Sequence, residues 1–423
     1  MPVTLVCGLQ WGDEGKGKLT HALAAGADLV GRFAGGPNSG HTIVVGGEKF
    51  ATHVVPVGIF QGAMCLCGPG MVIDPAGLVD ELAGIARRVP YGGRLFISEA
   101  AHLIFEYHRY QDRLDEQARG GGRIGTTMRG IGPAYADKMA RTGIRAGMLR
   151  DPDRLHEAVA HNLEQKNRLF TAIYGADPLP LAGVLDPVLA AAPTLAPMLA
   201  DVGRIARRAL DEGKRLLLEG NQGAMLDVDH GTYPFVTSSA CVPAGGFVGF
   251  GISPAYLDRA IGIAKAYTTR VGAGPMPTEQ DNEVGALIRE RGHEYGATTG
   301  RPRRCGWLDL VALRYAVGVS GVREIAVTLL DVLDAFDDLR VCTAYRTPTG
   351  ETTDFPADAA DFGAIEPIYI TLPGWRADTT GCRAFDALPE QARGYLHVIE
   401  RFVGVPVTVV SVGPGEAQTI MRG

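Results

Sequence analysis

The segment VCGLQWGDEGKGKLTHALAAG, residues 6–26, limits the possible folds more than any other part of the chain. A short apolar run leads into a glycine-rich loop, after which Leu19, Ala22 and Leu23 recur at helical spacing. This order is typical of a strand, a phosphate-binding loop and a helix, because backbone N–H groups at a helix start bind anions. The residues that suit a phosphate are Gly8, Gly12, Gly15, Gly17, Lys16 and Lys18. We therefore predict a nucleotide site directly after the first strand.

The loop departs from the usual phosphate-binding pattern in two ways. Gly12 and Gly17-Lys18 have the spacing G-x-x-x-x-G-K, but Leu19 stands where a Ser or Thr hydroxyl holds Mg²⁺. Asp13 also places a carboxylate inside the loop. Since carboxylates are alternative Mg²⁺ ligands, Asp13 is a candidate for that role, and it is equally a candidate base.

Three later apolar runs end in polar or glycine-rich turns in the same way. RLLLEG runs into Asn221-Gln222-Gly223, EIAVTLLD ends at Asp331, and VPVTVVSVGPG ends in a glycine turn. Short apolar strands that alternate with helices predict an α/β fold with a large, mostly parallel central sheet. Ligands of such sheets bind beyond the carboxyl ends of the strands, where we expect these four loops to meet.

Residues 101–213 have a different character, with long amphipathic runs such as PDRLHEAVAHNLEQKNRLFTAIYG. We interpret them as a mainly helical insertion that also contains a glycine-rich loop, RGGGRIGTTMRGIGPAYADK. No internal repeat and no low-complexity linker divides the sequence, so we predict a single domain over residues 1–423.

Charge, hydropathy and cysteine spacing exclude several classes of protein. The net charge of −6 leaves no excess of lysine and arginine for a general nucleic-acid surface. The longest apolar stretch, LAAAPTLAPMLA, is too short to cross a membrane, and the N-terminus lacks the basic flank of a signal peptide. The cysteines match neither a zinc site nor a redox pair, and free thiols are typical of a reducing cytosol. We therefore expect a cytoplasmic protein without membrane or nucleic-acid partners.

Three further segments carry side chains suited to a nucleotide reaction. His41 lies in a polar turn, FAGGPNSGHT, close in sequence to the phosphate loop, where an imidazole can protonate phosphate oxygens. Arg301, Arg303 and Arg304 precede a helix that we expect to begin near Trp307, an arrangement that suits a carboxylate or phosphate. The carboxylate that ends EIAVTLLD can accept both N–H groups of a guanine edge. Taken singly, each is also compatible with a structural role; the phosphate loop favours the ligand interpretation.

Taken together, the motifs resemble the adenylosuccinate synthetase family. QWGDEGKGK with GHT, RGIGPAY, DHGTYP, KAYTTRVGAGP, GATTGR and TLLDVLD follow the family's order from the first strand to the last loop. The resemblance implies an α/β homodimer that uses GTP and Mg²⁺ to join IMP and L-aspartate in AMP synthesis. It also implies a 6-phosphoryl-IMP intermediate, because GTP phosphorylates the C6 oxygen of IMP before the aspartate amine displaces phosphate.

The family's chemistry explains the presence of a carboxylate in the loop, because IMP must lose its N1 proton while its C6 oxygen is phosphorylated. The resemblance implies that Asp13 is the general base and a Mg²⁺ ligand, that His41 is the general acid, and that the carbonyl of Gly40 completes the metal shell. The remaining residues that it implies are Lys16 and Gln222 for catalysis; Gly12, Glu14, Gly15, Gly17, Lys18, Gly40, Thr42, Arg303, Leu329, Asp331, Ser411 and Gly413 for GTP; Asn38, Thr127, Thr237 and Arg141 for IMP; and Thr298, Thr299 and Arg301 for aspartate. Arg141 is expected to reach the IMP of the neighbouring subunit.

Several positions near the pockets depart from the family pattern. Leu329 replaces a lysine, so its stem can still pack near the guanine while the charge is lost. The other departures are Pro37, Ser39, Met128, Asn221, Pro302 and the segment SSACVPAGG, residues 238–246. They motivate an alternative hypothesis, a paralogue that joins aspartate to a different purine-like nucleotide in specialised metabolism. A GTP-binding switch is a third hypothesis, which the retained Asp13, His41 and Arg301 disfavour because a switch needs none of them.

Overall fold

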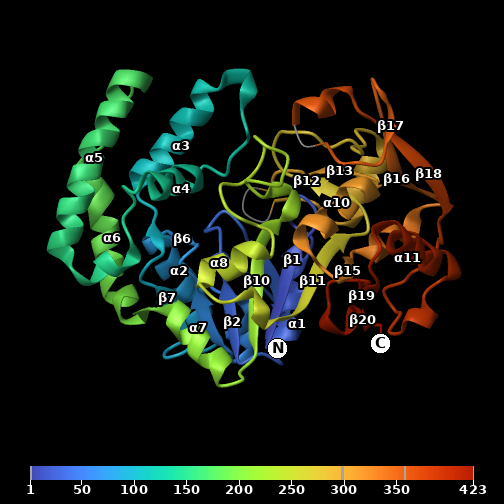
Figure 1. Cartoon of the computed structure of the whole chain (residues 1–423), viewed down its shortest axis with the longest axis horizontal. Coiled ribbons are helices and arrows are strands. Elements are labelled where there is room, and N and C mark those ends of the chain that lie inside the picture. The colour runs from blue at the N-terminus through green and yellow to red at the C-terminus, as the bar shows by residue number, and fades with distance from the viewer. Residues whose placement is uncertain (1, 297–299, 357–358, 423) are drawn as a thin grey trace.

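The computed structural model describes residues 2–296, 300–356 and 359–422 (Figure 1). A central sheet of ten strands runs through the molecule, and all its neighbouring strands are parallel except the last pair, β19 and β20. In spatial order the strands are β20 (Thr419–Met421), β19 (Val407–Ser411), β15 (Glu324–Thr328), β11 (Leu257–Lys265), β1 (Val3–Gly8), β10 (Leu216–Gly223), β2 (Leu29–Arg32), β5 (Met64–Cys67), β7 (Leu95–Ser98) and β9 (Leu199–Ala200). The predicted α/β architecture with a large, mostly parallel sheet is confirmed.

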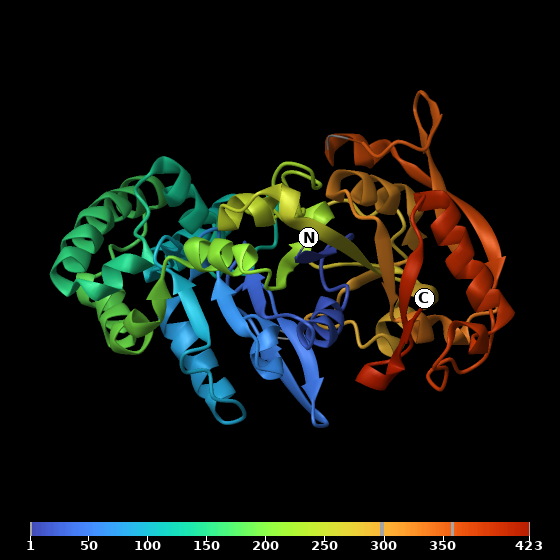
Figure 2. The ribbon, with the colours of Figure 1, turned by 60° about the horizontal axis from the view of Figure 1, so that its bottom comes forward.

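Alternation of side chains along the strands builds a separate core on each face of the sheet. Leu5 and Leu218 belong to one buried cluster, whereas their neighbours Val6 and Leu217 belong to the other. Because the strands are buried on both faces, they read as continuous apolar runs in the sequence. Figure 2 shows helices on both sides of the sheet. The first cluster includes residues of α7 (Val202–Asp211), α8 (Ala244–Phe250), α9 (Glu283–Arg291), α10 (Leu310–Ser320) and α11 (Glu390–Val403); the second includes residues of α1 (Lys16–Ala24) and α2 (Pro75–Ala86).

Within the predicted insertion, residues 101–213, a group of helices lies at one end of the sheet, drawn in teal and green in Figure 1, whereas β9 and α7 near its end belong to the central sheet and its core. The group consists of α3 (Glu106–Ala118), α4 (Ile131–Ala140), α5 (Pro152–Tyr174) and α6 (Leu181–Leu195). One described helical stretch, Leu181–Met198, has the length and hydropathy of a membrane-crossing segment. Val184, Leu185 and Val188 of that stretch are buried in the second core cluster, and α6 packs against α2 and α5. The helix thus buries one face in the core, and length and hydropathy alone do not distinguish it from a membrane span.

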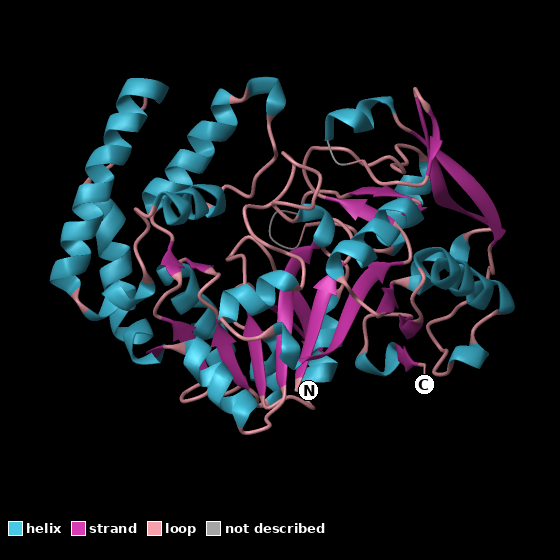
Figure 3. Cartoon of the chain, viewed as in Figure 1, coloured by secondary structure: helices cyan, strands magenta, loops and turns pink. Residues whose placement is uncertain are grey.

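A smaller sheet and three two-stranded ribbons complete the described fold (Figure 3). The small sheet lies beside α10 and α11 and contains β14 (Leu308–Asp309), β16 (Asp338–Thr347), β17 (Gly350–Thr352) and β18 (Glu366–Pro373). The ribbons pair β3 (His41–Val45) with β4 (Glu48–Thr52), β6 (Val72–Ile73) with β8 (His102–Leu103), and β12 (Thr268–Arg270) with β13 (Arg304–Gly306).

Two boundaries differ from the sequence expectation. The helix expected to begin near Trp307 begins at Leu310, because Leu308 pairs in β14 and Asp309 caps the helix by accepting the N–H of Ala312 at 3.0 Å. The segment Asn221-Gln222-Gly223 forms the end of β10, rather than a loop that follows it.

The four loops and strand ends expected at one edge of the sheet do lie together. They belong to β19, β15, β1 and β10, whose carboxyl ends point in one direction because these strands are mutually parallel through β11. The chain therefore brings together residues from its first, middle and last parts at the edge where α/β sheets bind ligands.

Candidate active site

The phosphate loop lies between β1 and α1 and has an unusual backbone. Gly12, Asp13 and Gly15 all adopt left-handed conformations, with φ of 88°, 58° and 80°. A side chain at Asp13 is therefore held in a conformation that L-residues rarely adopt, which is a frequent property of functional positions. The start of α1 also needs a glycine. A Cβ at Gly17 would lie 2.8 Å from the carbonyl oxygen of Thr42, so glycine lets the β3 ribbon, which begins at His41, reach the loop.

Glu14 turns inward and organises the loop from below. Its Oε1 accepts the backbone N–H groups of Gln10 at 3.1 Å and Gly12 at 2.9 Å, and its Oε2 accepts Lys16 Nζ at 2.5 Å. Both charged side chains are buried. The carboxylate fits its socket because Gly8 has no side chain: a Cβ there would lie 2.3 Å from Glu14 Oε2. Glu14 thus shapes the loop and balances the charge of Lys16, and any contact of Glu14 with a nucleotide would come from its backbone.

Asp13 is paired with an arginine from the opposite side of the site. Arg303 Nε lies 2.8 Å from Asp13 Oδ2, and Arg303 Nη1 lies 2.5 Å from Glu294 Oε2. Glu294 also accepts Lys265 Nζ and the hydroxyl of Tyr267, both at 2.6 Å. Burial alone would raise the pKa of Asp13, but Arg303, Lys265 and Lys16 outweigh burial and lower it. The Asp13 carboxylate is therefore ionised at neutral pH.

Exposure separates Asp13 from the other charged groups of this network. Its side chain is 39% exposed, whereas that of Glu294 is 1% exposed and that of Glu14 is fully buried. Since those two glutamates are also fully bonded within the protein, Asp13 is the carboxylate of the three that can meet a ligand. An ionised, partly exposed carboxylate fits a Mg²⁺ ion, which usually takes one or two protein carboxylates and completes its shell with phosphates and water. In the described part of the chain, no cluster of three or more His, Cys, Asp or Glu residues forms a protein-only metal site.

His41 is held by a buried glutamate on β10. Its Nδ1 contacts Glu219 Oε1, and the other carboxylate oxygen of Glu219 accepts the N–H of Val57 at 3.0 Å. Burial opposes ionisation of Glu219, but His41 and Arg32 more than compensate, so the pKa of Glu219 lies below its usual value. An ionised Glu219 requires the proton to be on His41 Nδ1. The other ring nitrogen, Nε2, lies 3.3 Å from the carbonyl oxygen of Asn221 at the end of β10.

The end of β10 and the segment after it contain polar groups without protein partners. Gln222 Nε2 and Ser239 Oγ are buried, and neither has a hydrogen-bond partner among the described residues. Buried polar atoms are rarely left unpaired, so these two are candidates for ligand contacts. Asn38 uses its Oδ1 to accept the N–H of Gly36 at 3.2 Å, which shapes the turn before His41. Thr237 is half-buried, whereas Thr127 is exposed in the loop before α4.

At the opposite end of the site, the phosphate loop is tied to the C-terminal glycine turn. Lys18 Nζ donates to Ser411 Oγ and the Gly413 carbonyl, both at 2.8 Å, and to the Gln418 carbonyl at 3.1 Å. Burial lowers the pKa of Lys18 to about 8. The loop is also tied to β15, because Thr328 Oγ1 donates to the carbonyl oxygen of Glu14 at 2.7 Å.

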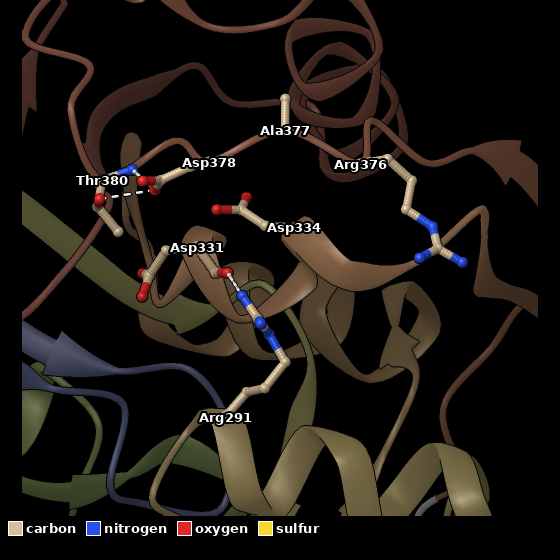
Figure 4. Close-up of a pocket in the computed structure, with 7 residues that line it drawn as sticks. All are labelled: Arg291, Asp331, Asp334, Arg376, Ala377, Asp378 and Thr380. Atoms are coloured by element: carbon tan, nitrogen blue, oxygen red, sulfur yellow. Dashed lines mark hydrogen bonds between the residues drawn. The ribbon is translucent and has the colours of Figure 1, made fainter.

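A cavity of about 320 Å³ lies beyond the end of β15, between the segment that follows this strand and residues 376–380 (Figure 4). Asp331 lines it, and its Oδ1 is buried without a partner among the described residues. Burial raises the pKa of Asp331, and the charges of Lys18 and Arg291 oppose the rise. Leu329, two residues earlier, is partly buried and adopts a left-handed conformation with φ of 57°. The cavity is lined by Arg291, Asp331, Asp334, Arg376, Ala377, Asp378 and Thr380.

The arginine side chains of the arginine-rich segment do not all point toward the same place. Thr298 and Thr299 lie outside the described residues, and Arg301 is exposed next to them. Arg304 points elsewhere, because it forms a two-pronged pair with Glu279, at 2.7 Å for its Nε. Arg141 lies at the end of α4, exposed and in a left-handed conformation with φ of 65°.

Sequence reasoning missed the buried charges that support the site, namely Glu219, Lys265 and Glu294. A signal was present for two of them, because Glu219 and Lys265 each interrupt or end an apolar strand, in RLLLEG and RAIGIAK. A charge at a position that must be buried needs a partner, and such partners often lie in functional sites.

Comparisons with known proteins agree over the whole chain. The family model described as adenylosuccinate synthetase matches residues 5–420. The chain is 50% identical over 422 residues to adenylosuccinate synthetase of Moorella thermoacetica and 47% identical over 424 residues to that of Heliobacterium modesticaldum. Each alignment covers 100% of this chain and 99% of the relative.

Solved structures give the same result. The fully ligated adenylosuccinate synthetase of Plasmodium falciparum is 37% identical, with a TM-score of 0.94 and 100% of both chains covered. The succinoaminodeoxyadenylate synthetase of cyanophage S-2L, solved with dGMP and dATP, is 22% identical with a TM-score of 0.64, over 99% of this chain and 95% of that one. The second likeness indicates a shared fold.

Proposed function

The chain belongs to the adenylosuccinate synthetase family, and from its geometry we propose how its residues divide the work of that family's reaction. It is a ligase that joins IMP and L-aspartate with GTP in purine biosynthesis, giving adenylosuccinate, GDP and phosphate. Relatives that are 46–50% identical over nearly the whole chain all carry this name. These relatives do not favour the alternative hypothesis of a paralogue that uses another purine-like nucleotide. The hypothesis of a GTP-binding switch is also not supported, because the relatives are ligases.

Asp13 is the base in this proposal, and the observation that carries the assignment is its exposure. It offers an ionised carboxylate to the site, while Glu14 and Glu294 are buried and fully bonded. Removal of the N1 proton from IMP makes the C6 oxygen nucleophilic toward the γ-phosphate of GTP. Phosphate then becomes the leaving group when the aspartate amine attacks C6, which is the role of a 6-phosphoryl-IMP intermediate.

The pairing of Asp13 with Arg303 has to change before the base can work. A carboxylate whose pKa is lowered by a neighbouring guanidinium is a weak proton acceptor. We assign Arg303 to GTP: when it moves toward the nucleotide, the pKa of Asp13 rises toward that of an effective base. Glu294 keeps its hold on Arg303 Nη1 during such a movement and limits its range.

Three further side chains act on the transferred phosphate in this scheme. His41, once protonated by the approach of the phosphate's negative charge, donates from Nε2, because Glu219 holds the Nδ1 proton. Lys16 contributes positive charge at the start of α1. Gln222, with its unpartnered Nε2, is assigned to the purine oxygen that receives the phosphate. His41 and Gln222 are pre-positioned, so they stabilise the developing charge without reorganisation.

Asp13 and the exposed backbone of Gly40 are the proposed protein ligands of Mg²⁺. An ion held by these groups would supply positive charge to the transferred phosphate. The backbone at Gly12, Glu14, Gly15, Gly17 and Thr42 is assigned to the phosphates of GTP. Lys18, Leu329, Asp331, Ser411 and Gly413 are assigned to its guanosine part.

The remaining assignments concern IMP, aspartate and a second subunit. Asn38, Thr127 and Thr237 would bind IMP, and Thr298, Thr299 and Arg301 would bind the aspartate carboxylates. We propose a cytoplasmic homodimer of single-domain chains, in which the exposed Arg141 reaches the IMP phosphate of the neighbouring subunit. Sedimentation velocity of the purified chain tests the dimer, and a monomer that retains full activity would contradict it.

A substrate panel tests the proposed function directly. With GTP, Mg²⁺ and aspartate present, formation of the new C–N bond is followed for IMP and for nucleotides that carry the same ring carbonyl. We expect IMP to have the highest kcat/KM of the panel. A nucleotide preferred over IMP would revive the paralogue hypothesis, and GTP hydrolysis that ignores both IMP and aspartate would contradict the ligase mechanism.

The clamp formed by Lys18 predicts a pH dependence of GTP use. The protonated ammonium has a donor for each of its three acceptors, whereas the neutral amine has two. Since the pKa of Lys18 lies at about 8, the clamp is complete below this pH and weakens above it. We expect kcat/KM for GTP to fall by about threefold to tenfold as the pH rises from 7 to 9, because the protonated fraction of Lys18 falls by about tenfold over this range. The Lys18→Arg variant stays charged and should give a flatter profile; an identical profile would refute the assignment.

A further inference from the structure

We propose that Arg291 is a positioning residue that aims the Asp331 carboxylate and thereby sets the preference for guanine. This inference rests on the proposed role of Asp331 as the guanine-binding residue. Arg291 is the last residue of α9, and its guanidinium points at the backbone carbonyl of Asp331 (Figure 4). Its Nε donates to the carbonyl oxygen of Val332, and its Nη2 donates to that of Asp331, both at 2.9 Å.

The two hydrogen bonds from the planar guanidinium of Arg291 fix the orientation of the backbone as well as its position. The guanidinium holds two consecutive carbonyls of the turn Leu330–Ala335, so it determines both where the backbone of Asp331 lies and how it is rotated. A lysine at this position, or any donor that makes a single hydrogen bond, would leave the backbone of Asp331 free to rotate. Because the side chain of Asp331 leaves the backbone at this point, its direction follows from the orientation that Arg291 imposes.

The carboxyl group of Asp331 has little else to hold it. Its Oδ1 is buried, and no donor from another described residue bonds to the carboxyl group. The turn also begins under strain, since Leu329 is a non-glycine residue with φ of 57°. A strained turn that carries an unrestrained carboxylate depends on an external brace, and Arg291 provides one from a different element.

The direction of this carboxylate matters for nucleotide choice. A guanine presents two N–H donors on one edge, at N1 and at the 2-amino group, and both carboxylate oxygens must face them together. Hypoxanthine has the first donor and lacks the second. ITP therefore loses one charged hydrogen bond if Asp331 is correctly aimed, and loses less if it is not. The ratio of kcat/KM for GTP to that for ITP reports the aim of the carboxylate.

The experiment compares this ratio in the full-length wild-type enzyme and four variants, with IMP and aspartate saturating. Arg291→Gln removes the two-pronged brace, Arg291→Lys keeps the charge without the planar fork, and Asp331→Asn removes the guanine-binding carboxylate. The matched control is Arg207→Gln. Arg207 is an exposed arginine on α7, and it likewise donates to a backbone carbonyl oxygen, that of Gly251, at 3.1 Å.

We expect Arg291→Gln to reduce the GTP/ITP ratio by about fivefold to tenfold, which is part of the roughly tenfold to hundredfold that a hydrogen bond to a charged group contributes. The KM for GTP should rise, while the KM for aspartate should change by less than about twofold. Arg291→Lys should lie between wild type and Arg291→Gln, and Arg207→Gln should keep the wild-type ratio. If Arg291→Gln does not fold, Arg291→Lys provides the same comparison with the charge retained.

The outcomes separate this inference from the function on which it rests. A changed ratio in both the Arg291 and Asp331 variants supports both assignments. A changed ratio in Asp331→Asn with an unchanged ratio in the Arg291 variants overturns the inference and leaves Asp331 as the guanine-binding residue. An unchanged ratio in Asp331→Asn overturns the role of Asp331, and the inference fails with it.

Discussion

The Asp13→Asn variant is expected to lose turnover almost completely while still binding GTP. Asparagine has nearly the same shape as aspartate, so the left-handed loop and its backbone donors remain in place. It cannot accept the N1 proton of IMP, and the loss of a positioned base reduces rates by about 10² to 10⁴-fold. We expect kcat to fall by about 10³-fold, measured as adenylosuccinate formation, with the dissociation constant of GTP within about threefold of wild type.

A magnesium titration separates the two roles assigned to Asp13. Activity that returns at high Mg²⁺ measures the loss of a metal ligand, whereas activity that stays low at saturating Mg²⁺ measures the loss of the base. Asp28→Asn is a suitable control, because Asp28 lies at the opposite edge of the sheet, where its carboxylate accepts the N–H of Arg215 at 2.7 Å. Turnover above about a tenth of wild type in Asp13→Asn would refute its role as the base.

The second large effect is expected from Glu219→Gln, a change that leaves the volume of the side chain almost unaltered. Glu219 accepts a hydrogen bond from His41 Nδ1 on one oxygen and another from the Val57 N–H on the other. Glutamine has one oxygen, so satisfying Val57 turns its amide N–H₂ toward Nδ1. His41 must then carry its proton on Nε2 and accept at Nδ1, which is the wrong tautomer for receiving a proton at Nε2.

We expect kcat to fall by about 10² to 10³-fold in Glu219→Gln, with smaller changes in KM for the three substrates. Nitrogen NMR of the His41 ring reads the tautomer independently of activity. Glu324→Gln is the matched control, since Glu324 is also a buried glutamate on a central strand, but it pairs with Arg259 at the amino end of β15. A kcat within about threefold of wild type in Glu219→Gln, or an unchanged tautomer, would contradict the positioning role.

The parts of this enzyme that follow from short stretches of sequence could be predicted. The strand–loop–helix order at the N-terminus, the strands of the sheet and the convergence of their carboxyl ends depend on local patterns and on the geometry of parallel sheets, and the structure confirms them. Lys18 was recognised as a cation of the loop, but its contacts with a turn 393 and 395 residues away were not, because no local pattern encodes them.

The supporting charges could not be predicted for a related reason. His41 was identified as a candidate acid from its loop, yet its partner Glu219 lies 178 residues away on another strand. The inward turn of Glu14 likewise depends on the space left by Gly8, which faces it across the loop. Long-range pairing of buried charges is decided by the packed structure, and sequence reveals only that a buried charge needs some partner.

The lengths of the outermost strands have a consequence for the solution behaviour of the enzyme. The ten-stranded sheet ends in β9, which has two residues, and in β20, which has three. A long exposed edge would offer a row of unpaired N–H and C=O groups to any other extended chain, which is a common start of aggregation. Two short edges leave almost no template for such growth on the central sheet, so its width adds little risk of edge-to-edge pairing.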